Sequence, residues 1–144
     1  MSQFFDNIQS QILVDAIGRV EKHTDGELRI HIEDFCDIDA VDRAKEVFYK
    51  LKMNLTQNKT GVLIYIASED RKIAIIGDEG INEKVSPYFW DSIIKDIVKE
   101  FSHARYLEGL LDGIEKVSKV LIEHFPSKEH NPNELSNEIS YGKL

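Results

Sequence analysis

The feature that most restricts the fold is an apolar segment followed, after a short polar turn, by a second apolar segment. Both alternating sets of side chains in Gly61–Ala67 are apolar, which is typical of a central strand covered by helices on both faces. Only Ser68–Arg71 separates it from Lys72–Gly77. This connection is too short for a crossover and predicts a β-hairpin. The two strands are therefore expected to be antiparallel, with Gly61–Ala67 in the middle of the sheet.

A strand with one apolar face precedes the hairpin. Leu28, Ile30 and Ile32 alternate with polar and charged residues, the period of a strand that is apolar on one side. A helical pattern that Asp39 can cap lies between this strand and Gly61–Ala67. Strands joined through a helix pair in parallel, with a right-handed crossover. The sequence therefore predicts a mixed sheet.

Three further segments carry apolar residues every three or four positions, which predicts helices. The first covers about residues 5–22, the second begins near Ser86-Pro87 and extends to Phe101, and the third runs from Tyr106 to Pro126. The remaining segment is polar and is expected to be a disordered tail. The predicted organisation is one α/β domain over residues 1–125, followed by a tail over residues 126–144.

Charge and composition narrow the possible partners. Lys and Arg number 18 against 26 Asp and Glu, a net charge of −8 that repels phosphate backbones, so we expect no nucleic-acid partner. No stretch approaches the roughly 20 apolar residues of a membrane-spanning helix. The first residues lack the pattern of a secretory signal. We therefore expect no transmembrane segment and a cytoplasmic location. A single cysteine, Cys36, excludes an internal disulfide.

Several segments, taken together in their order and spacing, resemble the TPM-domain family. The resemblance covers about residues 3–125, and its most specific part is the glycine-headed strand followed by an acidic-Asp-Arg turn. The matching segments are Thr24–Ile30, Gly61–Ile66, Glu69–Ile73, Gly77–Gly80 and Phe101–Gly109.

This resemblance implies a three-layer α/β/α sandwich, in agreement with the pattern of strands and helices. Relatives of this kind include membrane-anchored bacterial proteins and thylakoid proteins linked to photosystem maintenance. Acid phosphatase activity and calcium binding have been attributed to some of them. This chain is similar to the short branch without signal sequence or anchor. It also has Ala104-Arg105 where relatives often have Gly-Asp.

The expected functional site lies where the two parallel strands end. Parallel strands end at the same sheet edge, so Glu33 and Asp34, and with them the nearby Asp37, should approach the turn that contains Glu69 and Asp70. Converging carboxylates suit calcium or magnesium, which take oxygen ligands. The alternative is a solvated hairpin tip whose charges favour solubility.

Arg71 lies in the same turn. Its guanidinium can neutralise a carboxylate or bind a phosphate. The resemblance to a family with attributed phosphatase activity makes Arg71 the candidate phosphate-binding residue.

Two other polar groups have simpler explanations. Asp78 and Glu79 follow the second hairpin strand, which carries them to the opposite edge, about 20 Å away. Gly77–Gly80 is therefore interpreted as a turn into the next helix, with a second cation site as the alternative. Glu27, Arg29, His31 and Glu33 alternate along one strand face and are interpreted as an ion-pair ladder, with proton transfer as the alternative.

Two functions from different classes fit these observations, and the sequence leaves open whether the chain is an enzyme. The first is a TPM-like accessory protein that binds a divalent cation through Glu33, Asp34, Glu69 and Asp70, and a protein partner on a helical face. Exposed aromatic residues among Tyr88–Trp90 would mark such a contact. The second is a metal-assisted acid phosphatase in which Glu69 and Asp70 hold the cation and Arg71 steadies the phosphate.

Overall fold

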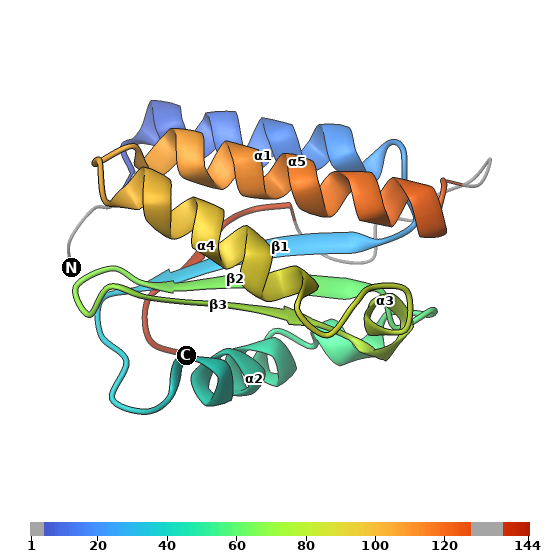
Figure 1. Ribbon diagram of the computed structural model, residues 1–144, viewed down its shortest axis with the longest axis horizontal. Coiled ribbons are helices and arrows are strands. Elements are labelled where there is room, and N and C mark those ends of the chain that lie inside the picture. The colour runs from blue at the N-terminus through green and yellow to red at the C-terminus, as the bar shows by residue number, and fades with distance from the viewer. Residues whose placement is uncertain (1–4, 128–136) are drawn as a thin grey trace.

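A computed structural model describes residues 5–127 and 137–144, and Figure 1 shows its three layers. Three long helices cover one face of a four-stranded sheet, and one helix covers the other. The elements in chain order are α1 (Asn7–Glu21), β1 (Glu27–Glu33), α2 (Ala40–Lys50), the 3₁₀ helix η1 (Met53–Leu55), β2 (Gly61–Ala67), β3 (Lys72–Gly77), α3 (Glu79–Asn82), α4 (Phe89–Phe101), α5 (Tyr106–His124) and β4 (Ser140–Tyr141). The predicted α/β/α sandwich with a mixed sheet is confirmed.

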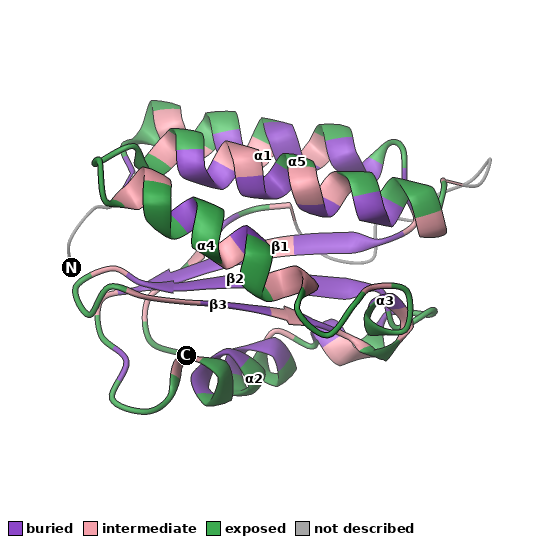
Figure 2. Cartoon of the chain, viewed as in Figure 1, coloured by how far each residue is buried: buried purple, intermediate pink, exposed green. Residues whose placement is uncertain are grey.

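The sheet has the order β3-β2-β1-β4. β1 and β2 are parallel, and β2 and β3 form the predicted antiparallel hairpin. β2 is buried at all seven positions because helices lie on both of its faces, as the purple ribbon in Figure 2 shows. The continuous apolar pattern of this strand therefore marked the centre of the fold.

Two apolar clusters separate the layers. The larger contains Leu28, Ile30 and Ile32 of β1 and packs under α1, α4 and α5. The smaller lies under α2 and contains Val47 and Phe48 of this helix together with side chains of β2 and β3. Asp39 precedes α2, and its carboxylate accepts hydrogen bonds from the N–H groups of Val41 and Asp42, so the predicted cap is present.

The C-terminal residues differ from the expectation of a disordered tail. β4 pairs in parallel with β1, opposite His31 and Ile32, and the Gly142 N–H donates to the carbonyl of Ile32 at 2.9 Å. Ile139 is buried beside it. The polar composition was misleading because an edge strand needs little apolar surface of its own when the neighbouring strand offers unpaired backbone groups. Residues 128–136 of the expected tail lie outside the described residues.

The Gly77–Gly80 segment forms the predicted turn. Asp78 caps the short helix α3 by accepting from the N–H of Glu79 at 2.8 Å. A Cβ at Gly80 would lie 2.1 Å from the carbonyl oxygen of Asn58, so only glycine fits there. The glycines of this segment therefore have a packing role at the edge opposite the expected site.

Within the described residues, the chain has no helix with the length and apolarity needed to cross a membrane.

Candidate functional site

Two backbone hydrogen bonds extend the β1–β2 pairing beyond the strands and form the predicted edge. Ser68 N–H donates to the Glu33 carbonyl at 2.9 Å, and Glu69 N–H donates to the Asp34 carbonyl at 2.8 Å. Parallel strands in register necessarily deliver the residues after their ends to the same place. The loop after β1 and the turn after β2 therefore lie side by side, as the sequence predicted.

Asp70 joins these two segments directly. Its Oδ2 atom accepts a hydrogen bond from the backbone N–H of Cys36 at 2.7 Å. Asp70 and Glu69 are exposed, and Asp34 is half-buried. The turn thus holds one carboxylate in a structural bond and leaves the Glu69 carboxylate facing solvent.

Glu33, in contrast, is buried and is bonded by two residues from other elements. Arg43 of α2 donates to both of its oxygens, from Nε and Nη2, each at 2.9 Å. The hydroxyl of Tyr65 on β2 donates to Oε2 of the same carboxylate. Burial alone raises the pKa of Glu33, but the hydrogen bonds from Arg43 and Tyr65 outweigh it and lower the pKa overall. Glu33 is therefore an ionised structural residue.

The same bonds shift the pKa of the partners in the opposite direction. Hydrogen bonding to Glu33 raises the pKa of Arg43, and burial together with the bond to Glu33 raises the pKa of Tyr65. Arg43 also donates from Nη1 to the exposed Glu46 at 3.1 Å. Both partners of Glu33 therefore keep their protons, and the group stays a fixed ion pair through the physiological range.

His31 lies two residues before Glu33 on the same face of β1 and is fully buried. Its Nδ1 shares a hydrogen bond with the hydroxyl of Ser140 on β4 at 2.8 Å. Its Nε2 is 3.8 Å from Glu33 Oε1 and has no hydrogen-bond partner among the described residues. Burial lowers the pKa of His31, and the Glu33 charge opposes this only in part. The imidazole is therefore neutral and held mainly by β4.

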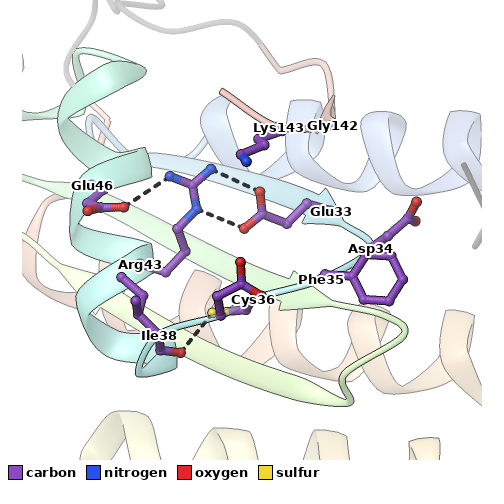
Figure 3. A pocket seen from close by; sticks show the side chains of 10 residues that line it. Glu33, Asp34, Phe35, Cys36, Ile38, Arg43, Glu46, Gly142 and Lys143 are labelled. Carbon is purple, nitrogen blue, oxygen red and sulfur yellow. Dashed lines mark hydrogen bonds and ion pairs between the residues drawn. The ribbon is translucent and has the colours of Figure 1, made fainter.

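A pocket of about 630 Å³ opens in front of the Glu33–Arg43 pair. Figure 3 shows the two side chains joined by their hydrogen bonds, with Lys143 from the C-terminal segment above them. Phe35 and Ile38 of the loop after β1 line it and are exposed. The pocket thus combines a charge-paired floor with a rim of both apolar and charged side chains.

Sequence reasoning missed Arg43 and Tyr65. Arg43 falls within the apolar pattern of α2, next to the buried Ala44 and four residues before the buried Val47. A buried carboxylate requires a cation, so an arginine on the inner face of the adjoining helix was the available signal. Val41, an apolar residue in the first turn of the same helix, is 43% exposed, whereas Arg43 is buried.

The remaining predicted groups lie apart. Asp78 N–H donates to the carbonyl of Gly61 at the start of β2, so Asp78 and Glu79 lie at the opposite edge, as predicted. Tyr88 is 76% exposed, whereas Trp90 donates its indole N–H to Asn82 at 2.8 Å. Across residues 5–127 and 137–144, no three His, Cys, Asp or Glu side chains are grouped so that they could hold a metal ion.

Comparison with known proteins agrees with this architecture. A family model described as the TPM domain matches residues 1–120. The chain belongs to the TPM-domain family. The NMR structure of the BA42 protein from the psychrophilic bacterium Bizionia argentinensis is similar, with 44% identity and a TM-score of 0.90, covering 99% of this chain and 98% of that one.

Two more distant solution structures share the fold. The N-terminal domain of a P. gingivalis protein is 20% identical with a TM-score of 0.71, over 88% of this chain and 83% of that one. The N-terminal domain of the cg2496 protein from Corynebacterium glutamicum is 13% identical with a TM-score of 0.55, over 87% and 76%. The search of curated proteins finds no match.

Proposed function

We propose that this chain is a TPM-domain accessory protein that acts by binding. We further propose that the sheet edge formed by the loop after β1 and the turn after β2 binds a divalent cation, Ca²⁺ or Mg²⁺. The observation that supports this most directly is the hydrogen bond from Glu69 N–H to the Asp34 carbonyl, 2.8 Å long. It places two acidic residues on neighbouring backbone segments. Oxygen-rich surroundings of this kind are what both cations prefer. A protein partner on a helical face remains part of the proposal.

The donor set available at this edge is small. Asp34 and Glu69 supply carboxylates, Asp70 has one oxygen engaged with Cys36, and Glu33 is occupied by Arg43. Ca²⁺ takes six to eight oxygen ligands, so water has to supply most of the coordination. We therefore expect a weak site, with a Kd of about 1 mM.

A metal-assisted phosphatase is the second candidate function. The exposed side chain of Arg71 favours it. Arg71 is exposed and makes no ion pair with another residue in the described parts of the chain, so its guanidinium is available to a phosphate. Hydrolysis also requires a proton donor for the leaving group. Glu33 is the buried carboxyl nearest the edge, but its pKa is lowered and both of its oxygens accept hydrogen bonds. It therefore does not supply the proton for the leaving group. Binding without hydrolysis is therefore the better supported function.

A titration with Ca²⁺ and then Mg²⁺, followed by amide resonances at physiological salt, tests the cation site. We expect shifts at residues 34–36 and 69–71, and weaker binding in Glu69→Gln and Asp34→Asn. Glu79→Gln is the matched control, because it removes the same charge at the opposite edge. Shifts centred on Gly77–Gly80, or equal weakening by the control, would contradict the proposal.

Hydrolysis of an aryl phosphate separates the two candidates. The binding function predicts no turnover above buffer with either cation present. Turnover that requires the cation and disappears in Asp70→Ala and Arg71→Gln, while both variants remain folded, would instead establish the phosphatase.

A further inference from the structure

A second cleft, of about 370 Å³, lies on the other side of the β2–β3 turn. One wall comes from the turn and from β3, and the other from the end of α4 and the start of α5. In Figure 1 the turn and the α4–α5 connection lie at the same end of the molecule. We call it the Arg71 cleft. Its size lies within the range of small-molecule sites, about 300–1,000 Å³.

The helical wall of the Arg71 cleft is apolar and reaches solvent. Val98 is 49% exposed and Tyr106 is 38% exposed. Phe101 packs edge-on against Tyr106, with ring centroids 5.2 Å apart. Exposed aromatic and branched side chains that meet in a hollow are typical of ligand pockets. This wall suits a flat or branched hydrocarbon group.

The charge of the Arg71 cleft has the opposite sign to that of the whole protein. The net charge of the chain is −8, yet the side chains that line this cleft include Arg71 and Lys72 and no carboxylate. Lys72 directs its ammonium to the carbonyls of Cys36 and Ile38, at 2.9 and 3.1 Å. Arg71 makes no ion pair or hydrogen bond with any residue in the described ranges. It is therefore the one lining cation whose charge is free for an anion.

Backbone strain accompanies this arrangement on both walls. Arg71 has φ 54° and Ala104 has φ 57°, in the left-handed region that favours glycine. Neither residue is glycine, and each position borders the cleft. Strained residues of this kind concentrate at binding sites, where the surrounding structure holds them.

We infer that the Arg71 cleft binds a small organic anion with an apolar body, of the arylalkanoic acid class. The carboxylate pairs with the Arg71 guanidinium, and the hydrocarbon part lies against Val98, Phe101 and Tyr106. These groups differ from the carboxylates of Asp34, Glu69 and Asp70 that are proposed to bind the divalent cation. Binding of the organic anion therefore does not depend on the cation.

The test uses 4-phenylbutyrate as the probe and 4-phenyl-1-butanol as its uncharged counterpart, without added divalent cation. We expect the acid to shift resonances of Arg71, Val98, Phe101 and Tyr106 with a Kd of about 1 mM, the affinity typical for a ligand of this size. The alcohol should bind about tenfold more weakly, because it lacks the charge-assisted hydrogen bonds to arginine.

Two variants and one control test whether Arg71 binds the carboxylate and whether the apolar wall binds the hydrocarbon part. Arg71→Gln should weaken binding of the acid about tenfold and leave the alcohol unchanged. Val98→Asp places a carboxylate on the exposed wall and should abolish binding of the acid. Arg19→Gln removes an exposed arginine from α1 and should change nothing.

Three results would overturn the inference. Equal binding of the acid and the alcohol would remove the role of Arg71. Equal shifts with inorganic phosphate alone would remove the role of the apolar wall. The absence of any shift at ten times the expected Kd would show that the cleft binds neither part of the ligand.

Discussion

The two ends of the polar face of β1 bury carboxyl groups in opposite ways. At the amino end, Glu27 is 1% exposed and lies beside Glu21 of α1, which is 6% exposed. At the carboxyl end, Glu33 is 5% exposed but is bonded by Arg43 and Tyr65. Burial raises the pKa of Glu21 to about 9, and the neighbouring Glu27 adds to the effect. At Glu33 the net pKa is lowered.

Similar burial thus gives opposite protonation states because the partners differ. A carboxyl beside another carboxyl in a dry environment keeps its proton, whereas one beside a guanidinium ionises. The partner at each end comes from a different helix, α1 for Glu27 and α2 for Glu33. The protonation state of a buried carboxyl is therefore set by the charge of the group that packs beside it.

The largest effect is expected at the ionised end. Glu33→Gln keeps the shape of the side chain but leaves Arg43 without its buried charge partner, and should lower the free energy of unfolding by about 3–5 kcal/mol. Glu46→Gln is the control, because Glu46 bonds the same arginine but its side chain is 54% exposed; it should cost less than about 1 kcal/mol. Urea unfolding measures both. Equal losses would show that burial does not distinguish the two bonds.

The protonated end should make stability depend on pH. Glu21 keeps its proton when folded up to about pH 9, but loses it near its ordinary value of 4.5 when unfolded. Between these values the folded state binds the extra proton, so stability falls as pH rises, by at most about 1.4 kcal/mol per pH unit. Glu21→Gln mimics the protonated form and should remove this slope.

Urea unfolding of both proteins from about pH 6 to about pH 8 gives the difference in slope. A parallel slope in the variant would show that Glu21 is ionised. At the Glu33 end the sign is reversed. The pKa of Glu33 is lowered in the folded state, so Glu33 stabilises the fold at pH values above its unfolded pKa of 4.5. This stabilisation is lost as the pH falls from 4.5 through the lowered folded-state pKa.

The smallest effect on stability is expected at His31, in the middle of the polar face of β1. Ser140→Ala removes the hydroxyl bonded to Nδ1 and should cost about 1 kcal/mol. Ser10→Ala removes the exposed hydrogen bond to the Tyr141 hydroxyl, 2.9 Å long, and should cost less than about 0.5 kcal/mol. Imidazole ¹⁵N shifts should change only in Ser140→Ala. Unchanged shifts in that variant would mean that β4 does not hold the His31 ring.

Much of the fold was predictable because its signals are local. The seven apolar residues of β2 and the short turn to β3 specify a central strand and a hairpin without reference to the rest of the chain. The alternation in β1 and the Asp39 cap act over a few residues in the same way. The meeting of Asp34 with Glu69 then follows from parallel pairing alone.

The partners at the site were less predictable because they come from distant segments. Glu33 and Arg43 are ten residues apart, but the inward position of Arg43 depends on how α2 rotates over β2 and β3. His31 and Ser140 are 109 residues apart, and the composition around Ser140 predicted disorder. A strand of two residues has no periodicity to detect, so β4 could be found only through the open edge of β1.

The sequence by itself determined the order and type of the main elements, the parallel pairing of β1 with β2, the antiparallel pairing of β2 with β3, and the edge where the acidic residues of two loops meet. These depend on hydrophobic periodicity and on connection length, which are properties of neighbouring residues. Only the tertiary structure decided which carboxyls are ionised and bonded, where Arg43 points, and how the C-terminal strand covers His31. Those outcomes depend on burial and on the charge of a partner, which are set only when distant segments pack together.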